Sequence, residues 1–220
     1  MSVNEQRRLN DVVSELSERI DAITKSQSRG RCLTLIGGET PFLNAIRKKA
    51  GRLGIQCINQ DNVGTEESNP VVVDTEVCKA GFNLSEKLDI DQIGHDGLSS
   101  CAQAVAEVFD YLHTLDGTNV VIIGRGHAVQ GLADTLVRWN DCTVTVCHSQ
   151  TKNLHASTQL ADVLVVAAPV RPAQVSHLVE KVVIDVSGTF KDFVDDEHYV
   201  GNIGRLTTSI LLNRAVNVED

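Results

Sequence analysis

Residues 119–149 read N-V-V-I-I-G-R-G-H-A-V-Q-G-L-A-D-T-L-V-R-W-N-D-C-T-V-T-V-C-H-S. The stretch begins with an apolar, β-branched run, passes through glycines that permit a tight turn, and then shows helical spacing before a second apolar run. A strand, a helix and a second strand in this order form a βαβ unit, whose two strands run parallel. This stretch therefore predicts a parallel sheet covered by helices.

The alternation of strand and helix continues on both sides of this stretch. Downstream, two more strands are predicted at residues 163–167 and 182–186, and two helices at residues 154–160 and 173–178. Four apolar strands with helical crossovers predict a Rossmann-like, doubly wound parallel sheet. Upstream, shorter segments predict a second α/β unit with a mainly parallel sheet; its strands are 32–36, 55–58 and 71–73, and its helix is 42–53.

The fold class predicted from these segments is α/β with two lobes, closed by a C-terminal helix. Residues 1–112, together with the helix over 204–217, are expected to form the first lobe, and residues 113–203 the second. Two more helices belong to this plan, because apolar residues recur every three or four positions over 7–23 and again from Ser99 or Ser100 to Leu112.

The composition excludes several classes of partner. The chain has 220 residues and a net charge of −9, with no cluster of Lys and Arg of the kind that nucleic-acid binding requires. Its apolar runs are much shorter than the ~20 residues that span a membrane. Residues 1–10 lack the apolar segment of a signal peptide. We therefore expect a soluble, cytoplasmic protein that binds neither nucleic acid nor membranes.

Metal and disulfide chemistry have no support in the spacing of the ligand-type residues. The six cysteines form no C-x-x-C pair, and the seven histidines form neither H-x-x-x-H nor H-E-x-x-H. Reduced, mostly buried thiols and surface or loop histidines are the expected state. We predict no metal site.

The glycine turn after the first quoted strand is the main candidate for ligand binding. Gly124-Arg125-Gly126 follows a strand and opens a helix, which is the setting of a dinucleotide-binding turn. The G-x-G-x-x-G fingerprint is incomplete, because Val129 occupies the third glycine position. A tight turn without any ligand is the alternative interpretation.

The end of the next strand indicates which dinucleotide would bind. A typical NAD site places an acidic residue there to bind the ribose, whereas this chain has His148 and Ser149. Arg125 in the glycine turn could pair with a phosphate, because guanidinium and phosphate form a strong bidentate contact. These residues favour the 2′-phosphate of NADP, with NAD as the second choice. Arg125 as a solvated turn residue is the alternative.

Several segments resemble the bifunctional methylenetetrahydrofolate dehydrogenase/cyclohydrolase family, the FolD type. The resemblance is carried by G-R-G-H-A-V at residues 124–129, T-V-T-V-C-H-S-Q-T at 143–151, A-D-V-L-V-V-A at 161–167 and V-V-I-D-V at 182–186. It implies two α/β lobes flanking a cleft, with NADP on the C-terminal lobe and a folate-type substrate between the lobes. A homodimer formed through the cofactor lobe is also implied.

The resemblance assigns cofactor contacts residue by residue. Gly124, Arg125 and Gly126 correspond to the family's cofactor turn, and Arg125 and Ser149 fall where family members bind the 2′-phosphate, with His148 beside them. The last helix is similar to the family's G-P-M-T segment, which places Thr207 among the cofactor residues. At the family's last glycine in the turn stands Gln130, whose side chain is expected to crowd the helix entry or the cofactor.

The resemblance also assigns the substrate-site residues Phe42, Asp74 and Asp96. Phe42 occupies the position of the tyrosine that packs on the folate, Asp74 that of a glutamine, and Asp96 that of the aspartate which binds the pterin. The family's cyclohydrolase lysine falls on Ile46. The neighbouring basic residues, Arg47, Lys48 and Lys49, point in other directions on a helix and are expected on a solvated face.

These observations leave three hypotheses. The first is an NADP-dependent methylenetetrahydrofolate dehydrogenase without effective cyclohydrolase activity, because hydride transfer depends mainly on the cofactor. The second is a catalytically silent NADP-binding or regulatory relative. The third is an oxidoreductase for another small substrate, suggested by Asp74, which could pair with a cationic group.

Overall fold

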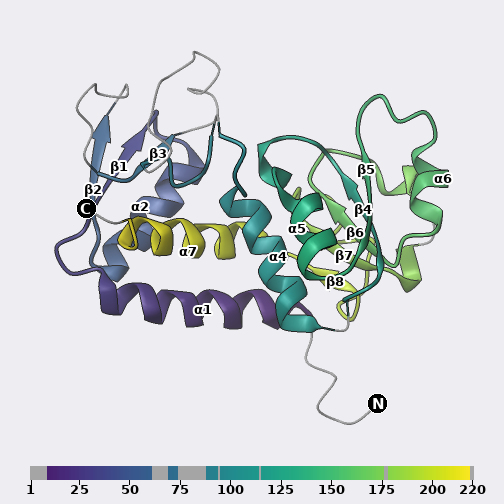
Figure 1. The fold of residues 1–220 in the computed structure, drawn as a ribbon, viewed down its shortest axis with the longest axis horizontal. Coiled ribbons are helices and arrows are strands. Elements are labelled where there is room, and N and C mark those ends of the chain that lie inside the picture. The colour runs from purple at the N-terminus through teal and green to yellow at the C-terminus, as the bar shows by residue number, and fades with distance from the viewer. Residues whose placement is uncertain are drawn as a thin grey trace, which may run out of the picture.

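The computed structural model describes residues 9–60, 69–73, 88–93, 95–113, 115–175 and 178–218. It contains two parallel sheets, and these form two lobes that lie side by side (Figure 1). The predicted two-lobed α/β fold is confirmed.

The first lobe has a three-stranded sheet with the order β2-β1-β3, in which all neighbours are parallel. Its strands are β1 (Cys32–Ile36), β2 (Gln56–Gln60) and β3 (Val71–Val73), and helix α2 (Pro41–Leu53) connects β1 to β2. The helix begins at Thr40, whose side chain accepts a hydrogen bond from the Leu43 N–H, and it ends at Gly54 with φ +81°. The strand β2 ends two residues later than the predicted strand over 55–58, and residues 61–68 lie outside the described part of the chain.

The second lobe has a five-stranded parallel sheet with the order β5-β4-β6-β7-β8. Its strands are β4 (Asn119–Ile123), β5 (Thr143–Cys147), β6 (Val163–Val166), β7 (Val182–Asp185) and β8 (Tyr199–Val200). Helices α5 (Leu132–Trp139) and α6 (Leu154–Gln159) connect the first three strands. This is the alternation that the quoted stretch predicts.

Two features of the second lobe differ from the prediction. The strand β8 was not expected, because two residues are too few to show a periodic pattern. The helix predicted over 173–178 is replaced by two 3-10 turns, Pro172–Gln174 and Leu178–Glu180. Pro172 can start a helical turn, but the segment is too short for a stable α-helix without further packing.

Three helices pack against one another: α1 (Leu9–Gln27), α4 (Ser100–Leu112) and α7 (Ile203–Val216). The first half of α7 buries Ile203, Leu206 and Ile210 in the core beneath the five-stranded sheet, where α1 and α4 also pack. Its second half buries Leu211 and Leu212 in the core of the first lobe. The C-terminal helix thus joins the lobes, as Figure 1 shows, and the boundary at residue 112 stays a prediction.

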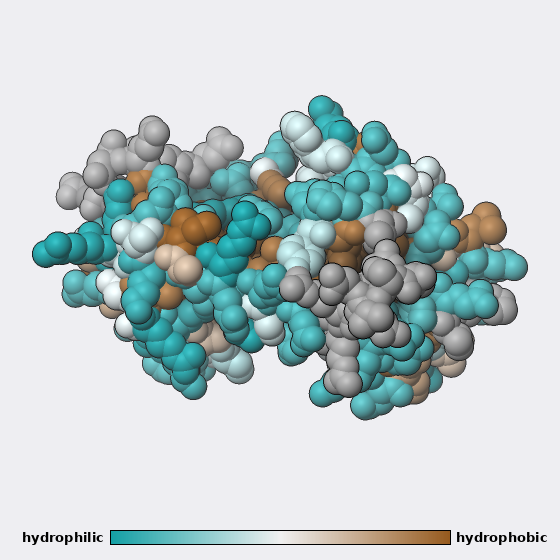
Figure 2. Space-filling view, turned by 90° about the horizontal axis from the view of Figure 1, so that it is seen from below, coloured by the Kyte–Doolittle hydropathy of each residue, from teal (hydrophilic) through white to brown (hydrophobic). Residues whose placement is uncertain are grey.

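The described surface is mainly polar, as expected for a chain with few long apolar runs. The face seen in Figure 2 is mainly hydrophilic, with hydrophobic residues in separate small patches. Within the described residues, no helix has the length and apolar character needed to cross a membrane. The described cysteines are all free, and two of them, Cys142 and Cys147, are buried.

Candidate functional site

A pocket of about 460 Å³ lies at the carboxyl ends of β4, β5 and β6. The loop after β4 contributes Gly124 and Arg125, the loop after β5 contributes His148 and Ser149, and the loop after β6 contributes Pro169. In the sheet, β4 lies between β5 and β6. The chain passes from β4 to β5 on one side and from β6 to β7 on the other, so the direction of the connections changes between β4 and β6. Ligands of doubly wound folds bind at this switch point, outside the carboxyl ends of the strands.

The close approach of two strands explains the first glycine of the turn. Gly124 has φ +132°, and a Cβ atom placed on it would lie 3.2 Å from the carbonyl carbon of Ala167 at the end of β6. A larger residue would push these loops apart or strain the backbone. The turn then runs through a short 3-10 helix to Gly131, which has φ +78° and begins α5. The helix therefore starts later than a complete G-x-G-x-x-G pattern would place it.

The polar groups around this pocket are suited to an anionic ligand. Arg125 and Ser149 are exposed beside it, and none of its described lining residues carries a carboxylate. Thr151 accepts a hydrogen bond from the His148 N–H (2.9 Å), and Nδ1 of His148 accepts one from the Gln150 N–H (3.2 Å). With Nδ1 used as an acceptor, the neutral ring carries its proton on Nε2.

The other predicted site residues do not line this pocket or lie outside the described residues. Gly126 lies in the same turn with open space around it, but Thr207 is buried on α7, where its hydroxyl donates to the Ile203 carbonyl at 2.9 Å. Phe42 is half-buried at the start of α2 and packs on the first-lobe core, whereas Asp96 is exposed. Asp74 lies outside the described residues.

Two buried carboxylates between the lobes were missed by the sequence analysis. Asp91 accepts a hydrogen bond from the Ser100 N–H at the start of α4 (2.9 Å), and its other oxygen lies 3.2 Å from Nε2 of His127. Asp89 is only 1% exposed, and burial raises the pKa of its carboxyl group. The D-I-D order of residues 89–91 was the available signal, because it places two acids around an apolar residue just before a helix.

Comparison with known proteins agrees with this arrangement. Residues 99–205 match the family model described as tetrahydrofolate dehydrogenase/cyclohydrolase, NAD(P)-binding domain. Residues 99–205 thus form a domain of this family. The matched segment contains the glycine turn, the strands β4 to β8 and every described residue that lines the pocket.

Individual relatives support the same family. The bifunctional protein FolD of Thermosipho africanus is 33% identical over 162 residues, which are 61% of this chain and 60% of that protein. The FolD protein of Rickettsia rickettsii is 27% identical over 265 residues, with 94% of this chain and 92% of that protein covered. The chain thus matches about three fifths of the length of the first relative and most of the second.

Solved structures share the whole fold at low identity. The 5,10-methylenetetrahydrofolate dehydrogenase of Bombyx mori superimposes with a TM-score of 0.68 at 21% identity, covering 96% of this chain and 94% of that chain. The bifunctional dehydrogenase/cyclohydrolase of Thermoplasma acidophilum gives a TM-score of 0.69 at 18% identity, covering 95% and 96%. The family fold therefore extends over both lobes.

Ile46 lies in the interior of the first lobe; the resemblance predicts that it occupies the position of the family's lysine. Ile46 is 0% exposed and packs in the same core as Leu43 and Ala50. Among Arg47, Lys48 and Lys49, only Lys48 is exposed. Lys49 is half-buried and binds Asp21 of α1 at 3.1 Å, so the expectation of a fully solvated basic face was wrong.

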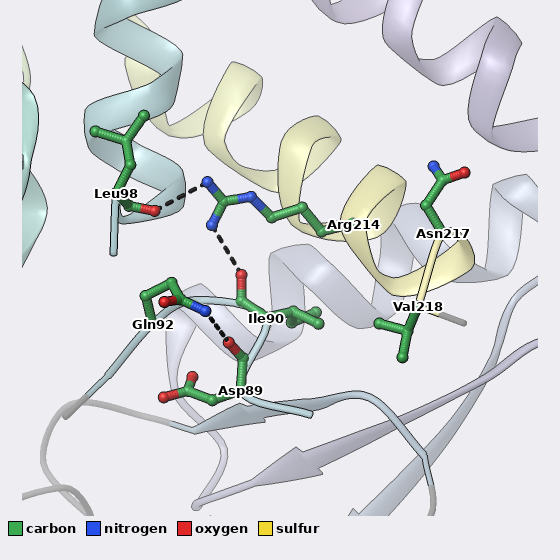
Figure 3. A pocket seen from close by; sticks show the side chains of 7 residues that line it. All are labelled: Asp89, Ile90, Gln92, Leu98, Arg214, Asn217 and Val218. Carbon is green, nitrogen blue, oxygen red and sulfur yellow. Dashed lines mark hydrogen bonds between the residues drawn. The ribbon is translucent and has the colours of Figure 1, made fainter. Parts of the chain in front are cut away.

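A second cavity of about 400 Å³ lies between the loop over residues 89–98 and the C-terminal end of α7 (Figure 3). Arg214 extends from α7 and donates hydrogen bonds to the carbonyls of Ile90 and Leu98, both at 2.9 Å. It also binds the side chain of Gln103. These acceptors occupy the guanidinium, so Arg214 fastens the loop to the helix and is not available to a ligand.

Proposed function

We propose that the protein is an NADP-dependent 5,10-methylenetetrahydrofolate dehydrogenase with little cyclohydrolase activity. The observation that carries this proposal is the pocket at the ends of β4, β5 and β6, where Arg125 and Ser149 stand beside a glycine turn and no described lining residue is acidic. A guanidinium and a hydroxyl are suitable partners for the 2′-phosphate of NADP. The family match supports the choice of a nicotinamide cofactor.

The residues of this chain would bind and orient the cofactor. Gly124 lets the backbone come close to a pyrophosphate, because it has no Cβ atom in a turn with φ +132°. Arg125 and Ser149 would bind the 2′-phosphate, and the loop at residues 168–170 would border the rest of the ligand. When bound, NADP supplies the carbon that accepts the hydride, and the protein supplies placement and electrostatics.

The position of Ile46 is the reason to expect little cyclohydrolase activity. Water attack on a methenyl bridge needs a positioned group that moves protons, and loss of such a group typically lowers the rate by about 10²–10⁴-fold. Ile46 has no titratable group and is enclosed by apolar side chains. Lys49 cannot take over this role, because its ammonium is bound to Asp21 on α1.

An assay of NADPH formation from methylenetetrahydrofolate tests the proposal. Arg125→Ala should raise the KM for NADP by at least about tenfold, because a charged hydrogen bond contributes about 1.5–3 kcal/mol, while the KM for NAD should change little. Arg138→Ala is the matched control, since Arg138 is exposed and pairs with Asp134 on its own helix. Absence of turnover with both NADP and NAD would contradict the dehydrogenase assignment.

A second candidate function is a binding protein that keeps the cofactor lobe without folate turnover. The apolar surroundings of Ile46 support this candidate, because the position that the resemblance assigns to the family's lysine holds a side chain without a titratable group. Thermal stabilisation by NADP without any turnover of methylenetetrahydrofolate would support this candidate. A homodimer and a cytoplasmic location remain predictions.

A further inference from the structure

Gln130 connects the glycine turn of the second lobe to a loop of the first. Its side-chain Nε2 lies within hydrogen-bonding distance of three carbonyl oxygens, those of Gln92 (3.2 Å), His95 (2.5 Å) and Gly97 (2.9 Å). Only the nitrogen of an amide can donate, so the three acceptors determine which way the amide is turned. The amide oxygen must then face His127, whose Nδ1 is 3.2 Å away.

This orientation determines the protonation of His127. The Gln130 oxygen is only an acceptor, so Nδ1 of His127 carries a proton. On the other side of the ring, Nε2 lies 3.2 Å from Oδ2 of Asp91, and a carboxylate is also an acceptor. A neutral ring would place its Nε2 lone pair against the carboxylate. Both contacts therefore favour the imidazolium, whose Nε2 lies at ion-pair distance from Asp91 without forming an aligned hydrogen bond.

The pKa of the His127 ring also depends on the other titratable groups around it, and their net effect favours the protonated form. Asp89 lies in the same loop as Asp91, with His95 at 3.7 Å from its carboxylate, and Arg214 approaches both acids from α7. Cys101 of α4 lies near Asp91, and burial raises the pKa of its thiol to about 11, which keeps it neutral. Burial by itself would lower the pKa of His127, but Asp91, Gln130 and Asp89 outweigh burial and raise it.

The contacts bear directly on the candidate cofactor site, because the same turn carries Gly124 and Arg125 into the pocket. The backbone of the turn is also attached to the first lobe: the Ser99 N–H donates to the Gln130 carbonyl at 3.3 Å. Gly131 packs so closely on Leu98 that an added Cβ would lie 3.1 Å from the Leu98 Cα. A change in these contacts would therefore shift Arg125 relative to β5 and β6.

We propose that Asp91, protonated His127 and Gln130 form an interlobe clamp, in which His127 and Gln130 are positioning residues that hold the turn over residues 124–131 in its cofactor-binding position. This inference rests on the proposed NADP binding. If NADPH binds the clamped turn more tightly, then NADPH must also favour the protonated ring, since coupling between two ligands is reciprocal. The affinity for NADPH should therefore fall as the pH rises through the pKa of His127.

An NMR titration of the His127 ring in the full chain tests this coupling. The signal is assigned by its loss in His127→Gln, and the pKa is measured with and without saturating NADPH. We expect NADPH to raise the pKa by about 0.7 unit or more, the equivalent of about a fivefold change in affinity. Gln130→Gly, which removes the side chain that joins the lobes, should weaken NADPH binding by about the same factor.

Two variants separate the clamp from general effects of pH. Asp91→Asn should keep the contact but lose the coupling, because an amide can donate to the unprotonated Nε2 of a neutral ring. His198→Gln is the matched control: His198 binds Asp195 at 2.7 Å in an exposed loop, and its loss should leave the coupling unchanged.

The possible outcomes distinguish this inference from the proposed function. NADPH binding with an unchanged pKa of His127 would overturn the clamp and leave the dehydrogenase proposal intact. Failure of the unmodified chain to bind NADPH would overturn the proposed function and the clamp together. If His127→Gln does not fold, the ring signal is assigned instead by elimination with variants of the other histidines, and Asp91→Asn and Gln130→Gly still decide the result.

Discussion

Lys49 of α2 and Asp21 of α1 form an ion pair at 3.1 Å, with side chains that are 14% and 24% exposed. The ammonium of Lys49 also reaches the carbonyl of Arg205 and the hydroxyl of Ser209, both on α7. Burial lowers the pKa of Lys49, and the carboxylate of Asp21 partly offsets this effect. One lysine thus joins three helices, and one of them, α7, contributes to the core of both lobes.

Replacing Asp21 by asparagine should destabilise the protein. The substitution leaves a half-buried ammonium without its counter-charge, so we expect the free energy of unfolding to fall by about 1–3 kcal/mol in urea denaturation. Glu18→Gln is the control, because Glu18 pairs with Arg205 at 3.1 Å with both side chains well exposed. An exposed pair contributes about 0–1 kcal/mol. Equal effects of the two substitutions would contradict the role assigned to Lys49.

Restoring a lysine at position 46 should not restore cyclohydrolase activity. Ile46→Lys would place an unpaired charge in an apolar core, and we expect a loss of at least about 3 kcal/mol in unfolding free energy. Ile46→Val, which keeps the site apolar, should lose only about 0.5–1.5 kcal/mol. Thermal denaturation followed by circular dichroism measures both. A stable Ile46→Lys protein with measurable cyclohydrolase activity would show that the side chain can reach the cleft.

The stability contributed by His127 should depend on pH. Its pKa in the folded state is raised above the ordinary value of 6.5, so the folded state holds the proton more tightly than the unfolded state. The stabilisation is complete below about pH 6.5 and is lost as the pH rises through the folded pKa. The difference in unfolding free energy between the unmodified protein and His127→Gln should therefore shrink with rising pH in urea denaturation. A difference that is constant or grows would contradict the charged ring.

Two glycines of the cofactor turn should respond differently to alanine. Gly131→Ala forces φ +78° on a side chain and brings its Cβ to 3.1 Å from Leu98, so we expect a loss of about 1–3 kcal/mol. Gly126 has φ −79° and no atom within 4 Å of an added Cβ, so Gly126→Ala should change stability by less than about 0.5 kcal/mol. Urea denaturation of both variants provides the comparison. Similar losses would show that the turn is not tightly packed on the first lobe.

The strands and helices could largely be predicted because their signals are local. Apolar runs locate β1, β3, β4 and β5 at the expected residues, and Ser99 begins α4 as a cap. The strand β8 could not be predicted, since its two residues become a strand only by pairing with β7. The helix expected over 173–178 was wrong, because a segment this short has little helical stability of its own and its described parts form 3-10 turns.

The candidate cofactor site could be predicted in part, because some of its residues also have local sequence signals. Gly124, Arg125, His148 and Ser149 follow the ends of parallel strands, and such ends meet at one edge of a sheet. Thr207 was assigned through a motif alone, and the structure places it inside α7, where its hydroxyl binds the helix backbone. Gln130 was expected to crowd the cofactor turn, yet its side chain points to the loop of the first lobe.

The amino-acid sequence by itself determined the two-lobed α/β fold, the glycine turn and the basic and hydroxyl groups beside it, because periodicity and strand-end chemistry depend on neighbouring residues. Only the tertiary structure decided that Ile46 is enclosed, that Lys49 binds Asp21, and that Asp91, His127 and Gln130 meet between the lobes. These contacts join segments far apart in the chain. These residues become buried and meet their charged partners only when the two sheets and α7 pack together. No local sequence pattern can therefore predict the contacts.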